Sequence, residues 1–352
     1  MFKPEQPYLI GETAFHHQGE TKFLSNLIDD ISEMGFDAIK FHLLLTPEEY
    51  MVKYHKVIDT IRNWIFNKEE WSGFFDQALT NNLELILLCN DVSSVQFVRA
   101  LNKPVRAIEI HATGINDYFL LEEASQFDGT IILGIGGSSV DEIQYAVDLL
   151  NSFGKNDIFL MYGFQNYPTK YEDINLSKML KINQLFELPL GYADHTDPDD
   201  PEHESLAALG IALGINVLEK HYSPDSDGNR VDSEAAISKE QFLSLSKKIN
   251  AFSKARGSGS LQLSEAEKKY GNVGPMKKAL VAANDIPKGK KIEESDLAFK
   301  RTNESSYVSQ MLFPKIVGLE VQKDIAKDEI IDFKKLAYDF KVAEFNEFIK
   351  KY

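Results

Sequence analysis

Short apolar segments alternate with longer amphipathic segments through about the first 250 residues of the chain. Segments such as YLIGE (8–12) and ELILLC (84–89) have the length and composition of buried strands. Longer segments such as VDEIQYAVDLLNSFG (140–154) repeat apolar residues at helical spacing, which predicts helices that bury one face. The alternation predicts eight strands separated by helices, at 8–12, 37–41, 84–89, 105–110, 130–135, 157–162, 188–193 and 215–220.

Eight successive strand-then-helix units favour one architecture. A helix between two strands allows them to lie parallel, so the repeated unit predicts an α/β protein with a parallel sheet. Eight units favour a (β/α)8 TIM barrel over residues 1–256. A doubly wound sheet is the alternative, but no segment resembles the glycine-rich dinucleotide turn of that fold.

The composition of the chain changes after the predicted barrel. Residues 257–275 are rich in Gly and Ser and then charged, which predicts a linker with a short helix. The segment DIPKGKKIEESDLAF, from Asp285, is repeated in DIAKDEIIDFKKLAY, from Asp324. The repeat predicts a small β-rich domain with internal pseudo-symmetry over 276–340, and residues 341–352 form a C-terminal tail.

Composition and charge restrict the class of protein. The 38 basic and 54 acidic residues give a net charge of -16, which argues against a nucleic-acid or anionic-membrane surface. The single cysteine, Cys89, excludes an internal disulfide and fits a reducing compartment. The N-terminus lacks the apolar run of a signal peptide, and no 18-residue apolar stretch follows. We therefore expect a cytoplasmic protein.

Titratable and polar side chains recur where the predicted strands end, which is the functional face of a barrel. They are Glu12, His16, His17, Lys40, His42, Asn90, Asp91, Glu109, His111, Asp194, His195, Glu219 and His221. A single histidine at a strand end is more often structural, but His195 and His221 follow neighbouring strands. Two imidazoles with carboxylates and waters suit a divalent cation such as Mn²⁺ or Zn²⁺.

Two further features allow more than one interpretation. The segment GIGGSS (134–139) is either a phosphate cradle at a helix N-terminus or a plain strand-to-helix turn. Three interpretations of Lys40 are open. It is a charge partner, a Schiff-base amine, or a lysine whose aliphatic chain is buried while its ammonium group reaches water.

Several motifs together resemble one family. GYADHT (191–196) and ALGINVLEKHY (212–222) closely resemble the GYSDHT and ALGA.viEKHF signature of sialic acid synthases. GETAFHHQGE (11–20) is similar to the AEIG.NHNG motif of that family, DAIKFH (37–42) to DAVKFQ, and YPTKYEDINL (167–176) to YPTP.EDVNL. ALVAANDIPKGKKIEESDLAFKR (279–301) resembles its antifreeze-like SAF domain. The chain is identified as a divergent member of the N-acetylneuraminate synthase family, which includes legionaminic and pseudaminic acid synthases.

The resemblance implies a fold and a reaction. It implies a barrel in a domain-swapped homodimer, in which each SAF domain caps the active site of the partner subunit. It also implies condensation of phosphoenolpyruvate (PEP) with an open-chain N-acetylmannosamine-type aldehyde, with release of phosphate and formation of a nonulosonic acid. The implied cofactor is a divalent metal, Mn²⁺ first, with Mg²⁺, Co²⁺ or Zn²⁺ as alternatives.

Carried over by position, the resemblance assigns roles to individual residues. His195 and His221 become the metal ligands, and Glu12 and Glu219 become carboxylates near the reacting carbons. Glu219 is then a general base or a group that orients water, and Lys40 contacts the substrates. The predicted substrate contacts are Tyr167, Gln165, Asp232, Arg301, Glu109 and Asp194.

The chain departs from the family motifs mainly where PEP is expected to bind. The family KIAS segment is EIHA here, so Glu109 replaces a lysine and Ala112 a serine. Gly134 and Ala193 replace further serines, and Gln165 replaces an asparagine. At ~4 Å and an effective dielectric of ~20, a carboxylate repels a phosphate charge by about 4 kcal/mol.

Three hypotheses follow. The first is a divergent synthase that uses PEP. The second is a metal-dependent aldol condensation or cleavage with a non-phosphorylated donor such as pyruvate. The third is a catalytically silent paralogue that binds a sugar acid.

Overall fold

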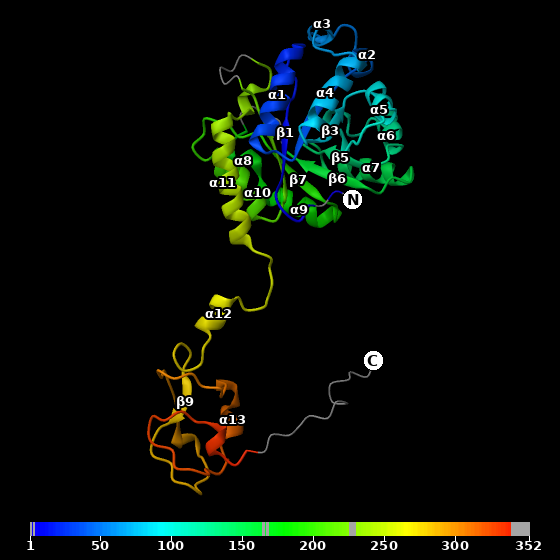
Figure 1. Cartoon of the computed structure of the whole chain (residues 1–352). Helices are drawn as coiled ribbons and strands as arrows, with labels where there is room; N and C mark the ends of the chain where they lie inside the picture. Colours follow the sequence, from blue (N-terminus) through cyan, green and yellow to red (C-terminus); the bar gives the residue numbers. More distant parts are fainter. Residues whose placement is uncertain (1, 3, 164–165, 167–168, 225–229, 339–352) are drawn as a thin grey trace. The chain divides into compact units, whose positions relative to one another are not determined.

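The computed structural model describes residues 2, 4–163, 166, 169–224 and 230–338, and the chain divides into two compact units, Met1–Ser258 and Gly259–Tyr352. The first unit contains a closed barrel of parallel strands in sequential order (Figure 1). Its strands are β1 (Tyr8–Glu12), β2 (Ala38–Leu43), β3 (Glu84–Cys89), β4 (Ala107–Ile110), β5 (Thr130–Gly134), β6 (Ile158–Tyr162), β7 (Leu190–Asp194) and β8 (Val217–His221). Each overlaps a predicted strand, so the predicted (β/α)8 barrel is confirmed.

Helices surround the barrel (Figure 1). They are α1 (Thr21–Met34), α2 (Pro47–Tyr50), α3 (Ile58–Arg62), α4 (Lys68–Thr80), α5 (Val92–Arg99), α6 (Tyr118–Ser125), α7 (Val140–Ser152), α8 (Tyr171–Ile174), α9 (Leu176–Phe186), α10 (His203–Ala212) and α11 (Lys239–Arg256). The residues that α1 buries, including Leu24, Leu27 and Ile31, recur three and four apart. The helix ends at Gly35, whose φ of 87° is accessible to glycine without strain. No helix within the described residues is long and apolar enough to cross a membrane.

The inside of the barrel has an apolar layer with a charged layer above it. The apolar layer includes Ile10, Ala38, Ile86, Ala107, Ile132, Phe159 and Val217, together with buried Phe2 from the N-terminal segment. Side chains alternate between the two faces of a strand, so the residue two positions further along points inward again. On β1, β2, β4 and β8 these next inward residues are Glu12, Lys40, Glu109 and Glu219, all of them buried. The strand pattern therefore places four charged side chains at the carboxyl end of the barrel.

The second unit contains α12 (Glu265–Tyr270), α13 (Phe313–Ile316) and an antiparallel pair, β9 (Ala279–Ala282) and β10 (Leu297–Lys300). Its separate apolar core includes Leu280, Ile286, Ile292, Ile316, Ile325 and Ile331. The short 3-10 turns Glu294–Asp296 and Phe333–Lys335 lie at matching positions of the two repeat copies.

The two copies bind each other reciprocally. The backbone of Ile286 pairs with that of Ile325 in both directions. The Asp285 carboxylate accepts a 2.8 Å hydrogen bond from the Lys327 backbone N–H, and Asp324 accepts one of 2.7 Å from Lys288. This exchange confirms the predicted internal pseudo-symmetry.

Candidate active site

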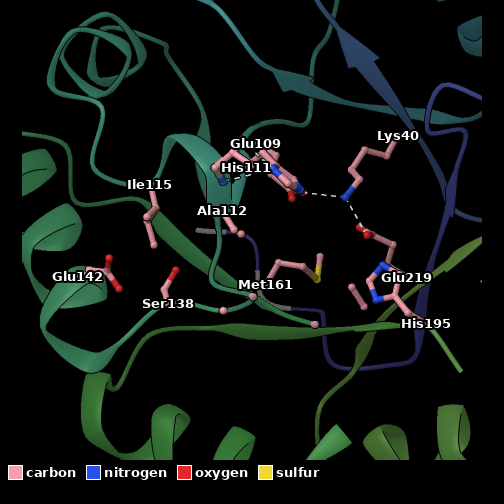
Figure 2. A pocket seen from close by; sticks show the side chains of 16 residues that line it. Lys40, Glu109, His111, Ala112, Ile115, Ser138, Glu142, Met161, His195 and Glu219 are labelled. Atoms are coloured by element: carbon pink, nitrogen blue, oxygen red, sulfur yellow. Dashed lines mark hydrogen bonds and ion pairs between the residues drawn. The ribbon is translucent and has the colours of Figure 1, made fainter. Parts of the chain in front are cut away.

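Lys40 lies at the centre of the charged layer. Its Nζ is 2.5 Å from Glu12 Oε2, 2.7 Å from Glu219 Oε1 and 3.1 Å from Glu109 Oε2. Figure 2 shows the ammonium pointing between Glu109 and Glu219. One buried cation therefore faces three buried carboxyl groups, which come from three different strands.

The excess of carboxyl groups changes how the layer titrates. Burial raises the pKa of Glu109 to about 8, because the neighbouring carboxylates add to the effect and Lys40 offsets it only in part. Burial, followed by the charge of Glu12, raises the pKa of Glu219 well above its usual value. Burial acts to lower the pKa of Lys40, but the three carboxylates outweigh it and raise that pKa. At neutral pH the lysine is charged and the layer holds carboxyl protons.

The two histidines predicted as metal ligands lie together. The ring centroids of His195 and His221 are 5.1 Å apart, and both side chains are buried. Two imidazoles that bind one ion at about 2.0–2.1 Å place their centroids roughly 5 Å apart, so the pair fits this role. Burial lowers the pKa of His195 to about 3 and that of His221 well below its usual value. Both rings are therefore neutral, which is the form that binds metals.

The pair is not a complete metal site by itself. Within the residues that the structure describes, no group of three or more His, Cys, Asp or Glu side chains is already arranged to hold a metal ion. Among the described residues the geometry thus supports two imidazole ligands, and a complete site needs further ligands.

A cavity of about 320 Å³ opens beside the charged layer, within the size range of small-molecule sites. Lys40, His195 and Glu219 line it on one side. The other side is lined by Glu109, His111, Ala112, Gly134, Ser138 and Glu142, as Figure 2 shows for the labelled side chains. The cavity therefore borders His195, one of the two predicted metal ligands, and the positions that depart from the family motifs.

Glu109 and Gly134 fit each other sterically. A Cβ atom at position 134 would lie 3.3 Å from Glu109 Oε1 and 3.1 Å from the backbone nitrogen of Ala112. A side chain at this position would therefore crowd the Glu109 carboxyl group. The two departures from the family motif act together, because the absent side chain leaves space for the larger acid.

The GIGGSS segment is a capped turn at the start of α7. Ser139 Oγ accepts a 3.2 Å hydrogen bond from the Glu142 backbone, and Glu142 Oε2 accepts one of 2.8 Å from the Ser139 backbone. This capping box uses two of the N–H groups that a phosphate would need, and it adds a carboxylate to the cavity wall. The geometry favours the plain strand-to-helix turn over the phosphate cradle.

Asp194 differs from its prediction. Its carboxylate lies 2.7 Å from Lys220 Nζ and accepts hydrogen bonds from Tyr192 and Thr196. Asp194 precedes inward-facing His195 by one residue, so strand alternation points it to the opposite side of β7. The structure thus gives Asp194 a structural ion pair where the sequence predicts a substrate contact, and Lys220 faces away from the site as expected.

The remaining predicted substrate contacts lie in different parts of the chain. Asp232 lies near the acidic side, where burial and then the charge of Glu12 raise its pKa to about 6. Arg301 belongs to the second unit, where its guanidinium Nε donates a 2.8 Å hydrogen bond to the Pro275 carbonyl. Tyr167 and Gln165 lie outside the described residues.

Two neighbours of the charged layer were not assigned a role from the sequence. His42 Nε2 contacts Glu12 Oε1, and burial lowers the His42 pKa to about 3. Glu142 lines the cavity from the start of α7. Both had a signal: His42 follows Lys40 by two positions, and Glu142 follows Ser139 by three, as in a capping box.

Comparisons with known proteins agree with this architecture. A model of the NeuB family matches residues 27–261, and a SAF domain model matches residues 277–337. The chain is 28% identical over 338 residues to N,N'-diacetyllegionaminic acid synthase of Campylobacter jejuni, covering 92% of this chain and 98% of that protein. It is 22% identical to N-acetylneuraminate-9-phosphate synthase of Homo sapiens, covering 92% and 91%.

Two solved structures are similar in fold. One is an N-acetylneuraminic acid synthetase from Leptospira borgpetersenii in complex with citrate, with a TM-score of 0.68 and 24% identity, covering 75% of this chain and 90% of that chain. The other is a putative spore coat polysaccharide biosynthesis protein E from Chromobacterium violaceum, with a TM-score of 0.79 and 20% identity, covering 95% and 100%. At these identities the likeness shows a shared fold.

Proposed function

The chain belongs to the NeuB family, and we propose that it condenses PEP with an N-acetylmannosamine-type aldose to form a nonulosonic acid. The observation that carries this proposal is the buried His195–His221 pair, of which His195 lines the same cavity as Glu219 and Lys40. Relatives named as legionaminic and pseudaminic acid synthases support the class of product.

The proposed reaction balances with one molecule of water. C3 of PEP forms a bond to the aldehyde carbon, water adds at C2, and the C2–O bond to phosphate breaks to leave a 2-keto acid and inorganic phosphate. A divalent cation held by His195 and His221, Mn²⁺ as first choice, would supply Lewis-acid polarisation of the aldehyde oxygen.

Glu219 is the group best placed to handle water and protons. Its Oε1 is held by Lys40, while its Oε2 is buried without a hydrogen-bond partner among the described residues. A carboxyl group with a raised pKa and one uncommitted oxygen suits proton transfer. We propose that Glu219 orients the attacking water and, in its ionised form, takes its proton.

Lys40 fits the role of a fixed charge partner. A Schiff base requires a neutral amine, whereas three carboxylates stabilise the charged form of Lys40. We propose that Lys40 holds Glu12 and Glu219 in place and offsets part of their charge when an anionic substrate enters the cavity.

Product formation tests the proposal directly. The metal-loaded protein is incubated with PEP and a panel of 2-acetamido hexoses, and phosphate and 2-keto acid are both measured. We expect equimolar phosphate and keto acid with at least one sugar, and loss of both in Glu219→Gln. Failure of every sugar in a broad panel to release phosphate would exclude PEP as the donor.

A non-phosphorylated donor is a second candidate, favoured by the acidic wall of the cavity. Glu109 and Glu142 both line the cavity where the family resemblance places the PEP contacts. With pyruvate, the methyl carbon loses a proton and bonds to the aldehyde carbon, and the aldehyde oxygen gains a proton. Keto-acid formation that depends on pyruvate and is lost in His195→Ala would support this donor, whereas full activity with PEP alone would exclude it.

We also propose a domain-swapped homodimer in which Arg301 completes the site of the partner subunit. Arg301 is exposed within its own unit, apart from its bonds to the Pro275 carbonyl. Mixing Arg301→Ala protein with Glu219→Gln protein tests this, because only a mixed dimer contains one site with both groups intact. Recovery of activity after subunit exchange supports the swap, and a purely additive mixture contradicts it.

A further inference from the structure

Beyond the charged layer, the barrel mouth carries an outer layer that is rich in imidazoles. Side chains alternate along a strand, so a residue two positions beyond an inward-facing one points inward again, roughly 6–7 Å closer to the mouth. On β2, β4, β7 and β8 these positions, at or directly after the strand end, hold His42, His111, His195 and His221. The ring centroids of His42 and His111 are 6.3 Å apart. Polar groups thus extend one layer above Lys40 and Glu109.

The departures from the family motifs differ between the two layers. In the inner layer, a lysine and two serines of the motifs are replaced by Glu109, Gly134 and Ala193, so hydrogen-bond donors are lost. In the outer layer, the alanine of the KIAS motif is replaced by His111, so a polar group is gained. Both changes on β4 fall within the four residues EIHA. The nitrogen group that this strand offers has therefore moved two positions toward the mouth.

The local structure fixes which nitrogen of His111 carries the proton. The Nδ1 atom accepts a 3.3 Å hydrogen bond from the Thr113 backbone N–H, at the start of the 3-10 turn Ala112–Gly114. The hydroxyl oxygen of Thr113 lies 3.0 Å from the same nitrogen. Because Nδ1 is an acceptor, the neutral ring carries its proton on Nε2. His111 therefore has an N–H donor at the edge of the ring that faces away from the turn.

His111 borders the cavity of the candidate active site. It lines this cavity together with Lys40 and His195, and it is partly exposed, whereas Glu109 below it is buried. Figure 2 shows His111 on the same side of the cavity as Glu109 and across from His195. The other acid of this wall, Glu142, comes from the helix after β5, whereas the ring of His111 is near that of His42 on β2. A ligand at this imidazole would therefore lie on the β2 side of β4.

We propose that His111 binds the phosphate group of PEP, so that the phosphate site lies one layer further out than the family motifs place it. The inference rests on the PEP-dependent function proposed above. The N–H at Nε2 donates to a phosphate oxygen, and hydrogen bonds to an ionised acceptor are the stronger kind. The outward position also separates the phosphate from Glu109, and Coulomb repulsion falls in inverse proportion to distance. The reacting carbons of PEP remain in the cavity beside Lys40 and His195.

Binding of PEP without a sugar tests the proposal separately from turnover. The full-length protein, loaded with Mg²⁺, is titrated by calorimetry with PEP and with pyruvate, which lacks the phosphate. We expect His111→Ala to weaken PEP binding by about tenfold or more, the usual contribution of one hydrogen bond to a charged group. Binding of pyruvate should not change. His111→Gln keeps an N–H donor near the place of Nε2 and should restore most of the affinity for PEP.

The control variant and the second ligand separate the possible failures. His55 is an exposed histidine on the segment after β2, and His55→Ala should bind PEP as the wild type does. Equal affinities of the wild type and His111→Ala for PEP would overturn the phosphate site alone. An equal loss of affinity for pyruvate would also overturn it, because the contact would then be to the carboxylate. A wild-type protein that binds no PEP would overturn the PEP-dependent function as well.

A measurement on the wild type avoids any effect of a variant on folding. Nitrogen NMR of the histidine side chains follows the two ring nitrogens of His111 during addition of PEP to the Mg²⁺-loaded protein. The resonance of Nε2 should shift with PEP but not with pyruvate, while Nδ1 keeps its bond to Thr113 and shifts little. An Nε2 resonance that PEP does not move would overturn the proposal.

Discussion

The two sides of the barrel mouth differ in how they relate to the family motifs. On the side formed by β7, β8 and β1, His195, His221, Glu219 and Glu12 match the motifs and lie together. On the side formed by β4 and β5, Glu109, Ala112 and Gly134 depart from them. Both sides border one cavity. The groups proposed to activate the aldehyde and those proposed to face the donor are thus separate parts of the site.

The departures on the donor side are structurally coordinated. Glu109 extends into space left by Gly134 and forms an ion pair with Lys40. A set of unrelated losses would leave voids or unpaired charges, which are unfavourable in a buried layer. The donor side is therefore a rebuilt surface, which Lys40 connects to Glu12 and Glu219 on the histidine side.

The largest effect is expected on the histidine side. His221→Ala should lower turnover by about 10³-fold or more, because a Lewis acid supplies several kcal/mol and each 1.36 kcal/mol is tenfold. Turnover and bound metal are measured together. His203→Asn is the control, since His203 begins α10 and belongs to no predicted site. If His221→Ala retained a tenth of wild-type turnover, His221 would not be essential for catalysis.

Next in size is the effect of Asp194, which faces away from the cavity. Asp194→Asn should lower the free energy of unfolding by about 3–5 kcal/mol, because it leaves the buried charge of Lys220 without its partner. Denaturant unfolding measures the loss, with exposed Asp199→Asn as control. The KM values of the folded protein should stay unchanged. A raised KM with unchanged stability would instead support Asp194 as a substrate contact.

Glu109 should give stability a pH dependence. Its pKa is about 8 in the folded protein and near 4.5 in the unfolded chain. Its contribution to stability is therefore fully present below pH 4.5 and is lost as the pH rises through 8.

Comparison of the wild type with Glu109→Gln isolates this contribution. From pH 5 to pH 8, the wild type should lose stability relative to Glu109→Gln by up to a few kcal/mol, since one pKa unit corresponds to about 1.36 kcal/mol. Thermal unfolding across this range measures the difference. Glu142→Gln, a change at a solvent-accessible carboxylate, should show no such trend. Parallel stability curves for the wild type and Glu109→Gln would contradict a raised pKa.

The smallest expected effect concerns the donor. Glu109→Gln should lower the KM for PEP by about tenfold, a fraction of the ~4 kcal/mol that an unscreened carboxylate would impose on phosphate, because Lys40 and protonation already reduce that charge. The KM for pyruvate should change little. An unchanged KM for PEP would show that the phosphate does not approach Glu109.

Much of the fold can be predicted from the local pattern of apolar and polar residues in the sequence. The eight strands were predictable because their apolar runs are short and regularly spaced, and Glu219 and His221 followed from strand alternation on β8. The same alternation points Asp194 away from the barrel mouth, whereas the prediction of a substrate contact relied on the match of GYADHT to the family motif. The capping box of Ser139 and Glu142 was also readable from its spacing.

Other features depend on barrel closure. Lys40 and Glu109 are 69 residues apart and meet only because β2 and β4 project toward one axis. The steric relation between Gly134 and Glu109 requires the stagger of β4 against β5. The position of His16 depends on a turn with positive φ at alanine and glutamine, which residue preferences argue against. No local pattern contains this information.

In the second unit, each repeat copy contributes an aspartate to the turn of the other copy, and this has a consequence for how the unit assembles. Asp285 completes the turn of the later copy and Asp324 that of the earlier one, so each copy satisfies a backbone N–H group of the other. Each copy alone is therefore half of a symmetric unit, as one subunit is in a twofold dimer. The covalent connection keeps the halves at a high effective concentration for each other, so their association does not depend on protein concentration.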